Sequence, residues 1–89
     1  MSTTKEDIQR WLEHGKTVGA THMLVVCDTY DYEDYPVYIY PLEKKSEHNE
    51  TDVNKAVRIY NVNMQKVMEV YSFALPLEPQ LNEHRAMHF

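Results

Sequence analysis

The sequence predicts an α+β fold: a small three-stranded, mainly antiparallel sheet with helices packed on it, in the order α-β-β-α-β-α. One observation is the continuous apolar run at 22–27, HMLVVC, whose β-branched centre is typical of a strand buried on both faces. Another is the helical periodicity on either side of this run. At 89 residues the chain is expected to form a single domain over 1–89 with one modest core.

A first helix is predicted over residues 4–17. Thr3 and Glu6 have the spacing of a capping box, with Thr3 as the N-cap. Apolar residues recur on one face of this segment: Ile8, Trp11, Leu12 and Val18. Gly15 has no side chain and would allow the helix to pack close to a sheet. Gly19 is expected to end the helix in the left-handed conformation.

The remaining elements follow from pattern and from turn residues. A second strand is expected at 37–40, closed by Pro41, and a third at 64–73, where Val67, Glu69, Tyr71 and Phe73 alternate with Met68, Val70 and Ser72. Residues 28–36 and 43–51 are predicted loops. Helices are expected at about 52–60 and 81–86. Large apolar side chains are assigned to the core: Trp11, Met23, Met64, Met68 and Phe73.

Charge and composition narrow the function classes. Fourteen acidic against nine basic residues give a net charge of −5, which disfavours binding to a nucleic-acid polymer. The N-terminus has no apolar leader and no run reaches the roughly 20 residues of a membrane span, so we expect a cytoplasmic protein without a membrane partner. Five basic residues occur within 44–66, apart from the acids of 28–34, and such a division could bind an anion or could dock one copy onto another in the expected homo-oligomer.

The stretch 27–38, CDTYDYEDYPVY, is the candidate functional segment. Tyrosines offer rigid contact area, and carboxylates between them would select a basic partner. A nucleobase could instead stack on the phenols while Lys55, Arg58 or Lys66 pair with its phosphates. A plain solvated turn is the third interpretation. The candidate binding residues are Asp28, Tyr30, Asp31, Tyr32, Glu33, Asp34, Tyr35, Lys55, Arg58 and Lys66.

Other chemistries find weaker support. The acids do not follow the ligand order of an EF-hand, and we expect no metal and no cofactor. Asp28 directly follows Cys27 and should raise the thiol pKa, so no catalytic residue is assigned. His84 and His88 have a helical zinc spacing, to which Glu83 and His22 could add, but two histidines do not close a site. No glycine-rich phosphate loop is present in the sequence.

Three stretches resemble a family of short proteins from phages and prophage-bearing bacteria: GATHMLVVCDTYDYEDYPVY at 19–38, NMQKVMEVYSFAL at 63–75 and QLNEHRAMHF at 80–89. Together with W-L-x-x-G-K at 11–16 they cover about two thirds of the chain. The resemblance implies a phage-like origin and a setting inside an infected cell. It transfers no catalytic residue.

These observations lead to an expected function. The chain is interpreted as a non-enzymatic phage-type binding protein, a host-defence inhibitor that sequesters a small nucleotide signal or blocks a host protein. One alternative is a metal-assisted phosphoesterase that uses Asp28, Asp31 and Asp34. Another is a structural or scaffold protein of a phage assembly.

Overall fold

The computed structural model describes residues 3–62 and 64–81 of the chain. Its elements are α1 (Lys5–Val18), β1 (His22–Asp28), β2 (Glu33–Ile39), the 3₁₀ helix η1 (Leu42–Lys44), α2 (Val53–Tyr60) and β3 (Gln65–Ser72). A further helical segment begins at residue 77 and reaches residue 81. The α+β class and the predicted order of helices and strands are therefore confirmed.

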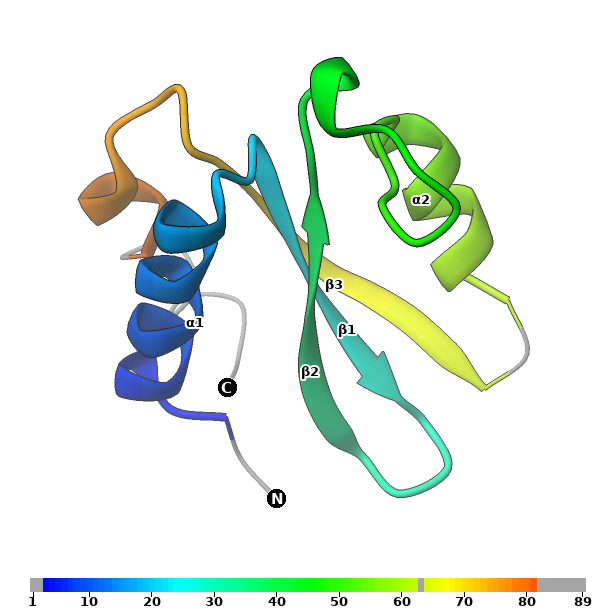
Figure 1. Cartoon of the computed structure of the whole chain (residues 1–89). Helices are drawn as coiled ribbons and strands as arrows, with labels where there is room; N and C mark the ends of the chain where they lie inside the picture. Colours follow the sequence, from blue (N-terminus) through cyan, green and yellow to red (C-terminus); the bar gives the residue numbers. More distant parts are fainter. Residues whose placement is uncertain (1–2, 63, 82–89) are drawn as a thin grey trace.

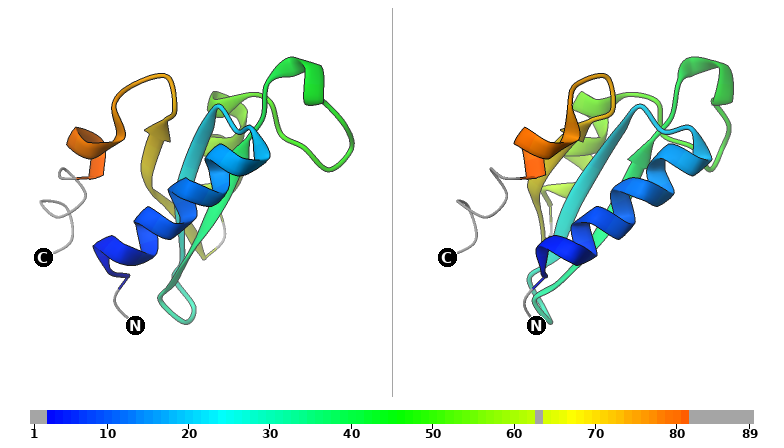
Figure 2. Two further views of the ribbon diagram at one scale, coloured as in Figure 1. Left: turned by 60° about the vertical axis from the view of Figure 1, so that its left-hand side comes forward. Right: turned by 90° about the vertical axis from the view of Figure 1, so that its left-hand side faces the viewer.

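The sheet has the strand order β2-β1-β3, and both pairs are antiparallel. The helix α1 and the segment 77–81 lie on one side of the sheet, and α2 lies on the other (Figures 1 and 2). We call these sides the α1 face and the α2 face. β1 is the central strand of the sheet, and a helical layer packs on each of its two faces.

The core follows the alternation of β1. Met23 and Val25 pack on the α1 face with Ile8, Leu12, Tyr71 and Leu81. Leu24 and Val26 pack on the α2 face with Ile39 and Ala56. All four β1 side chains have 0% exposure, which confirms the prediction of a strand buried on both faces. Complete burial of such side chains contributes about 1.5–3 kcal/mol each.

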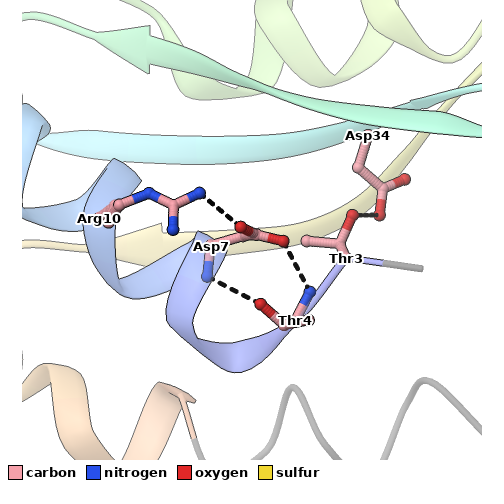
Figure 3. Close-up of polar contacts among 5 residues, drawn as sticks. All are labelled: Thr3, Thr4, Asp7, Arg10 and Asp34. Carbon is pink, nitrogen blue, oxygen red and sulfur yellow. Dashed lines mark hydrogen bonds and ion pairs between the residues drawn. The ribbon is translucent and has the colours of Figure 1, made fainter. Parts of the chain in front are cut away.

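The N-cap of the first helix lies one residue later than the sequence predicts. Thr4, not Thr3, is the N-cap: its hydroxyl accepts from the Asp7 N–H at 3.1 Å, and the Asp7 carboxylate accepts from the Thr4 N–H at 3.0 Å (Figure 3). The capping box predicted from Thr3 and Glu6 is wrong because Asp7 satisfies the same spacing from Thr4. The backbone N–H of Thr4 and the Arg10 guanidinium lower the pKa of Asp7.

The C-terminus of α1 is closed as expected. Gly19 has a φ of 77°, in the left-handed region, and its N–H reaches the carbonyls of Gly15 and Lys16. The Lys44 ammonium, from η1, donates to the Val18 carbonyl at 2.7 Å. A cation at this end of a helix is favourable because the last carbonyls are unpaired. The 3₁₀ turn that places Lys44 was not predicted.

The hairpin between β1 and β2 is shorter than the sequence suggests. β2 begins at Glu33, so the connection is the four residues 29–32 instead of the predicted 28–36. Glu33, Asp34 and Tyr35 are strand residues opposite Asp28, Cys27 and Val26. β2 is an edge strand, which tolerates both its charged residues and Pro36.

A bulge changes the alternation predicted for β3. Val25 pairs with Glu69 and Val26 pairs with Val67, so Met68 is the extra residue. Val67 consequently packs on the α2 face, whereas Tyr71 and Phe73 pack on the α1 face. The prediction that these three side chains share one side is wrong. Met64 precedes the strand and is 56% exposed, so its assignment to the core is wrong as well.

The last helix starts earlier than predicted. Leu77 and Leu81 lie in the segment 77–81 and pack against the α1 face. Residues 82–86 of the predicted helix, and with them Glu83 and His84, lie outside the described residues, as does His88. Within the described part of the chain, no helix combines the length and apolar character needed to cross a membrane.

Gly15 generates a test of how α1 meets the sheet. A Cβ at this position would lie 2.5 Å from Phe73 Cζ and 3.0 Å from Tyr38 Cε1. Tyr38 is held in place, since its hydroxyl donates to the Trp11 carbonyl at 2.7 Å. Gly15→Ala should therefore lower the free energy of unfolding by about 1–3 kcal/mol in urea denaturation, although alanine favours helix by about 1 kcal/mol.

The double variant Gly15→Ala/Phe73→Leu provides the control. Shortening the ring should return part of the lost stability, because the added methyl then has space. An equal or higher urea midpoint for Gly15→Ala alone would contradict the close approach.

Candidate functional site at the hairpin tip

The turn that joins β1 to β2 is built by its own carboxylates. Asp28 Oδ1 accepts from the Tyr30 N–H at 2.9 Å, and Asp31 Oδ1 accepts from the Glu33 N–H at 3.0 Å. The Tyr32 N–H donates to the Asp28 carbonyl at 2.7 Å. Aspartates in turns commonly hold the backbone two residues on. These acids therefore have a structural role, and the turn has a defined conformation.

The same turn directs two phenols into solvent. Tyr30 is 77% exposed and Tyr32 is 68% exposed, which are large values for aromatic side chains. Asp31 and Glu33 are exposed beside them. We call Tyr30, Asp31, Tyr32 and Glu33 the hairpin tip. Figure 1 shows the β1–β2 turn extending beyond both helical layers.

The other acidic and aromatic residues of the predicted segment are used by the fold. Asp34 is half-buried and accepts a hydrogen bond from the Thr3 hydroxyl, which ties the start of α1 to β2 (Figure 3). Tyr35 packs on the α2 face, and its hydroxyl accepts from Gln65 Nε2 at 2.7 Å. Asp28 is half-buried at the end of β1. These three predicted site residues are therefore less accessible than the tip.

The basic candidates are distributed over two elements. Lys66 pairs in register with Cys27, one residue from the turn, and is exposed. Lys55 and Arg58 are exposed on α2, where the Lys55 N–H donates to the N-cap Asp52. Within residues 3–62 and 64–81, the one ion pair joins Arg10 to Asp7, so the tip carboxylates have no cationic partner there.

Met64 is a further residue beside the hairpin turn, and the sequence did not indicate this position. The Thr29 N–H donates to the Met64 carbonyl at 2.8 Å, so Met64 lies directly beside the turn. Its φ of 66° and the φ of 59° at Tyr32 are left-handed values at residues other than glycine. The two strained residues thus occur in neighbouring turns at one end of the molecule. No local sequence signal indicates this, since methionine is usual in a core.

The geometry argues against a metal centre formed by Asp28, Asp31 and Asp34. Two of these carboxylates accept turn N–H groups and the third accepts from Thr3. Among the residues that the structure describes, no three His, Cys, Asp or Glu side chains gather as a cation site. Within the described residues, the three aspartates named for the phosphoesterase alternative are therefore not gathered into a cation site.

Cys27 is a poor nucleophile in this setting. Burial raises the pKa of its thiol, and the nearby carboxylates of Asp34 and Asp28 raise it further. The expectation from sequence that an adjacent acid raises this pKa is confirmed in direction. The thiol is therefore protonated at neutral pH, when a thiolate would be needed to attack.

Two grooves on the described part of the surface lie away from the tip. One groove of about 340 Å³ lies between α1 and the segment 77–81, lined by Leu12, Glu13 and Leu81 among others. Another of about 640 Å³ follows β3 and includes Val57, Val70 and Leu75. No tip residue lines either of these two grooves.

Comparisons with protein-family models, with curated proteins and with solved structures find no match to this chain. The resemblance to phage proteins therefore stays a prediction, and the geometry of the tip carries the functional argument.

Three raised pKa values predict a loss of stability in alkali. Burial raises the pKa of Cys27 above 9.0, and burial followed by neighbouring phenols raises those of Tyr35 and Tyr38 above 10.0. The unfolded chain loses these protons first as the pH rises. The free energy of unfolding should thus be at its full value below about pH 8 and decline above about pH 9.

Urea midpoints measured from neutral to alkaline pH check this. Cys27→Ala should reduce the decline, because one of the three groups no longer titrates. A pH-independent midpoint would contradict the burial of these groups.

Proposed function

We propose that this chain is a non-enzymatic binding protein that docks its hairpin tip onto a basic surface of another protein. The observation that carries the proposal is the exposure of Tyr30 and Tyr32, 77% and 68%, beside the exposed carboxylates of Asp31 and Glu33. Every other tyrosine, tryptophan or phenylalanine in the described part of the chain is more buried than these two.

The conformation of the turn supports a role in recognition. The bonds from Asp28 and Asp31 hold the backbone of the turn, so little entropy is lost when its phenols become immobile against a partner. Tyrosine also loses few rotamers on binding and carries a hydroxyl at its tip. The turn therefore has the properties of a preorganised contact surface.

A protein partner is favoured over a small nucleotide. A nucleotide site needs a hollow and cations for its phosphates, but the grooves described above exclude the tip. Of the three basic candidates, only Lys66 is placed next to the turn by strand register. The acidic tip would repel phosphates and attract a cationic protein surface.

The resemblance to phage proteins suggests where the partner occurs. A small phage-type protein with no assigned catalytic set would act by occupying a host protein, and a host-defence component is the natural candidate. In this interpretation the compact body serves as a carrier for the tip.

Affinity capture tests the proposal. Immobilised wild-type protein should retain a specific protein from a bacterial lysate. The double variant Tyr30→Ser/Tyr32→Asn should retain at least about tenfold less of that protein, because a hot-spot tyrosine contributes about 2 kcal/mol to binding. Asparagine is chosen because it tolerates the left-handed backbone at this position. Quantitative mass spectrometry of the bound fraction gives the ratio.

The matched control is Lys55→Ala/Arg58→Ala, which changes α2 and leaves the tip intact; it should retain the same protein as wild type. Capture should also weaken as salt rises, since the contact pairs opposite charges. If calorimetry with cyclic dinucleotides or ADP-ribose gives heat that the α2 variant abolishes, the nucleotide interpretation replaces this one.

A further inference from the structure

The proposed function gives the partner a basic surface, and the turn before β3 specifies the chemistry of that surface further. Resting on that proposed function, we propose that Met64 joins Tyr30 and Tyr32 in one contact surface, and that the partner is a different protein presenting an apolar recess with cationic side chains around it. Met64 supplies the apolar part of the surface, and Asp31 and Glu33 supply the charged rim.

Met64 lies close to the hairpin turn. The hydrogen bond from the Thr29 N–H to the Met64 carbonyl, 2.8 Å, continues the β1–β3 ladder past Asp28 and Gln65. Met64 is 56% exposed, and Val62, before it, is 51% exposed. The exposed Met64 therefore lies opposite Thr29, the residue that precedes Tyr30 in the turn. A local apolar patch with a polar rim is a common feature of protein contact sites.

The backbone is strained at both Met64 and Tyr32. Met64 and Tyr32 adopt φ values of 66° and 59°, and such a residue costs about 1–3 kcal/mol unless it is glycine. Because both side chains are exposed, their burial offsets little of this conformational cost. Glycine or asparagine would hold the same backbone more favourably. Two large side chains are thus kept where they lower the stability of the fold, which indicates that they serve a contact.

The charge of the contact surface bears on the identity of the partner. Asp31 and Glu33 are exposed, and no described residue forms an ion pair with either of them. The chain as a whole carries a net charge of −5. A second copy meeting tip to tip would place these carboxylates against one another, which is unfavourable. A cationic rim on a different protein removes that repulsion, and a central apolar anchor matches the usual anatomy of an interface.

The test begins with a defined probe. A displayed library of random peptides is selected on the immobilised wild-type protein. Enriched peptides should combine Leu, Phe, Met or Trp with at least a pair of Lys or Arg residues. One enriched peptide is then synthesised with a fluorophore, and its Kd is measured by anisotropy against each protein variant.

Met64→Asn and Tyr30→Ser are the informative variants. Each should weaken binding about tenfold or more, while Lys55→Ala leaves the Kd unchanged. Met64→Asn should also keep or raise the urea midpoint, because asparagine tolerates the left-handed backbone. Loss of binding without loss of stability is the signature that a purely structural Met64 would not give.

The outcomes separate the two proposals. If Tyr30→Ser abolishes binding and Met64→Asn does not, the inference on Met64 is wrong and the proposed function stands. If no peptide is enriched, or if enriched peptides lack basic residues, both are overturned. If light scattering shows that wild-type copies associate and that Met64→Asn abolishes the association, the occupant is a second copy and the inference of a different partner fails.

Discussion

The burial of β1 on both faces is the constraint on which the rest of the molecule depends. Four consecutive side chains, Met23 to Val26, point alternately into two separate clusters and are fully buried. Neither cluster can form without a layer of helix over it, so α1 and α2 must lie on opposite sides of the sheet (Figure 2). A chain of 89 residues supports one modest core, and here that core is divided between the two faces of the sheet.

This arrangement determines what remains available for binding. Both helices cover the sheet beside β1, and the hairpin turn continues past them (Figure 1). The aspartates of the turn satisfy its backbone, which leaves the phenols of Tyr30 and Tyr32 without a role in the fold. Asp34 and Tyr35, by contrast, secure α1 and the α2 face. Acidic and aromatic residues that are neighbours in sequence therefore divide into a structural set and an exposed set.

The division explains how far the sequence could predict the site. Tyr30 and Tyr32 were expected to be accessible, and they are. Glu33, Asp34 and Tyr35 were assigned to a loop because a run of acids and a proline disfavours a strand. They form one nevertheless, because pairing with β1 outweighs local preference and β2 is an edge. Met64 was assigned to the core as the first residue of a predicted strand at 64–73, but β3 begins at Gln65 and Met64 lies exposed before it.

The sequence by itself determined the elements whose signals are local. The apolar run of β1, the periodicity of α1 and the glycine that ends it act over a few residues, so they can be identified without knowledge of the fold. Only the tertiary structure decided the strand register, the bulge at Met68 and the proximity of Met64 to Thr29. Along the β1–β3 pair those features arise from pairing between residues 35–50 positions apart, and the free energy of such pairing depends on the whole core.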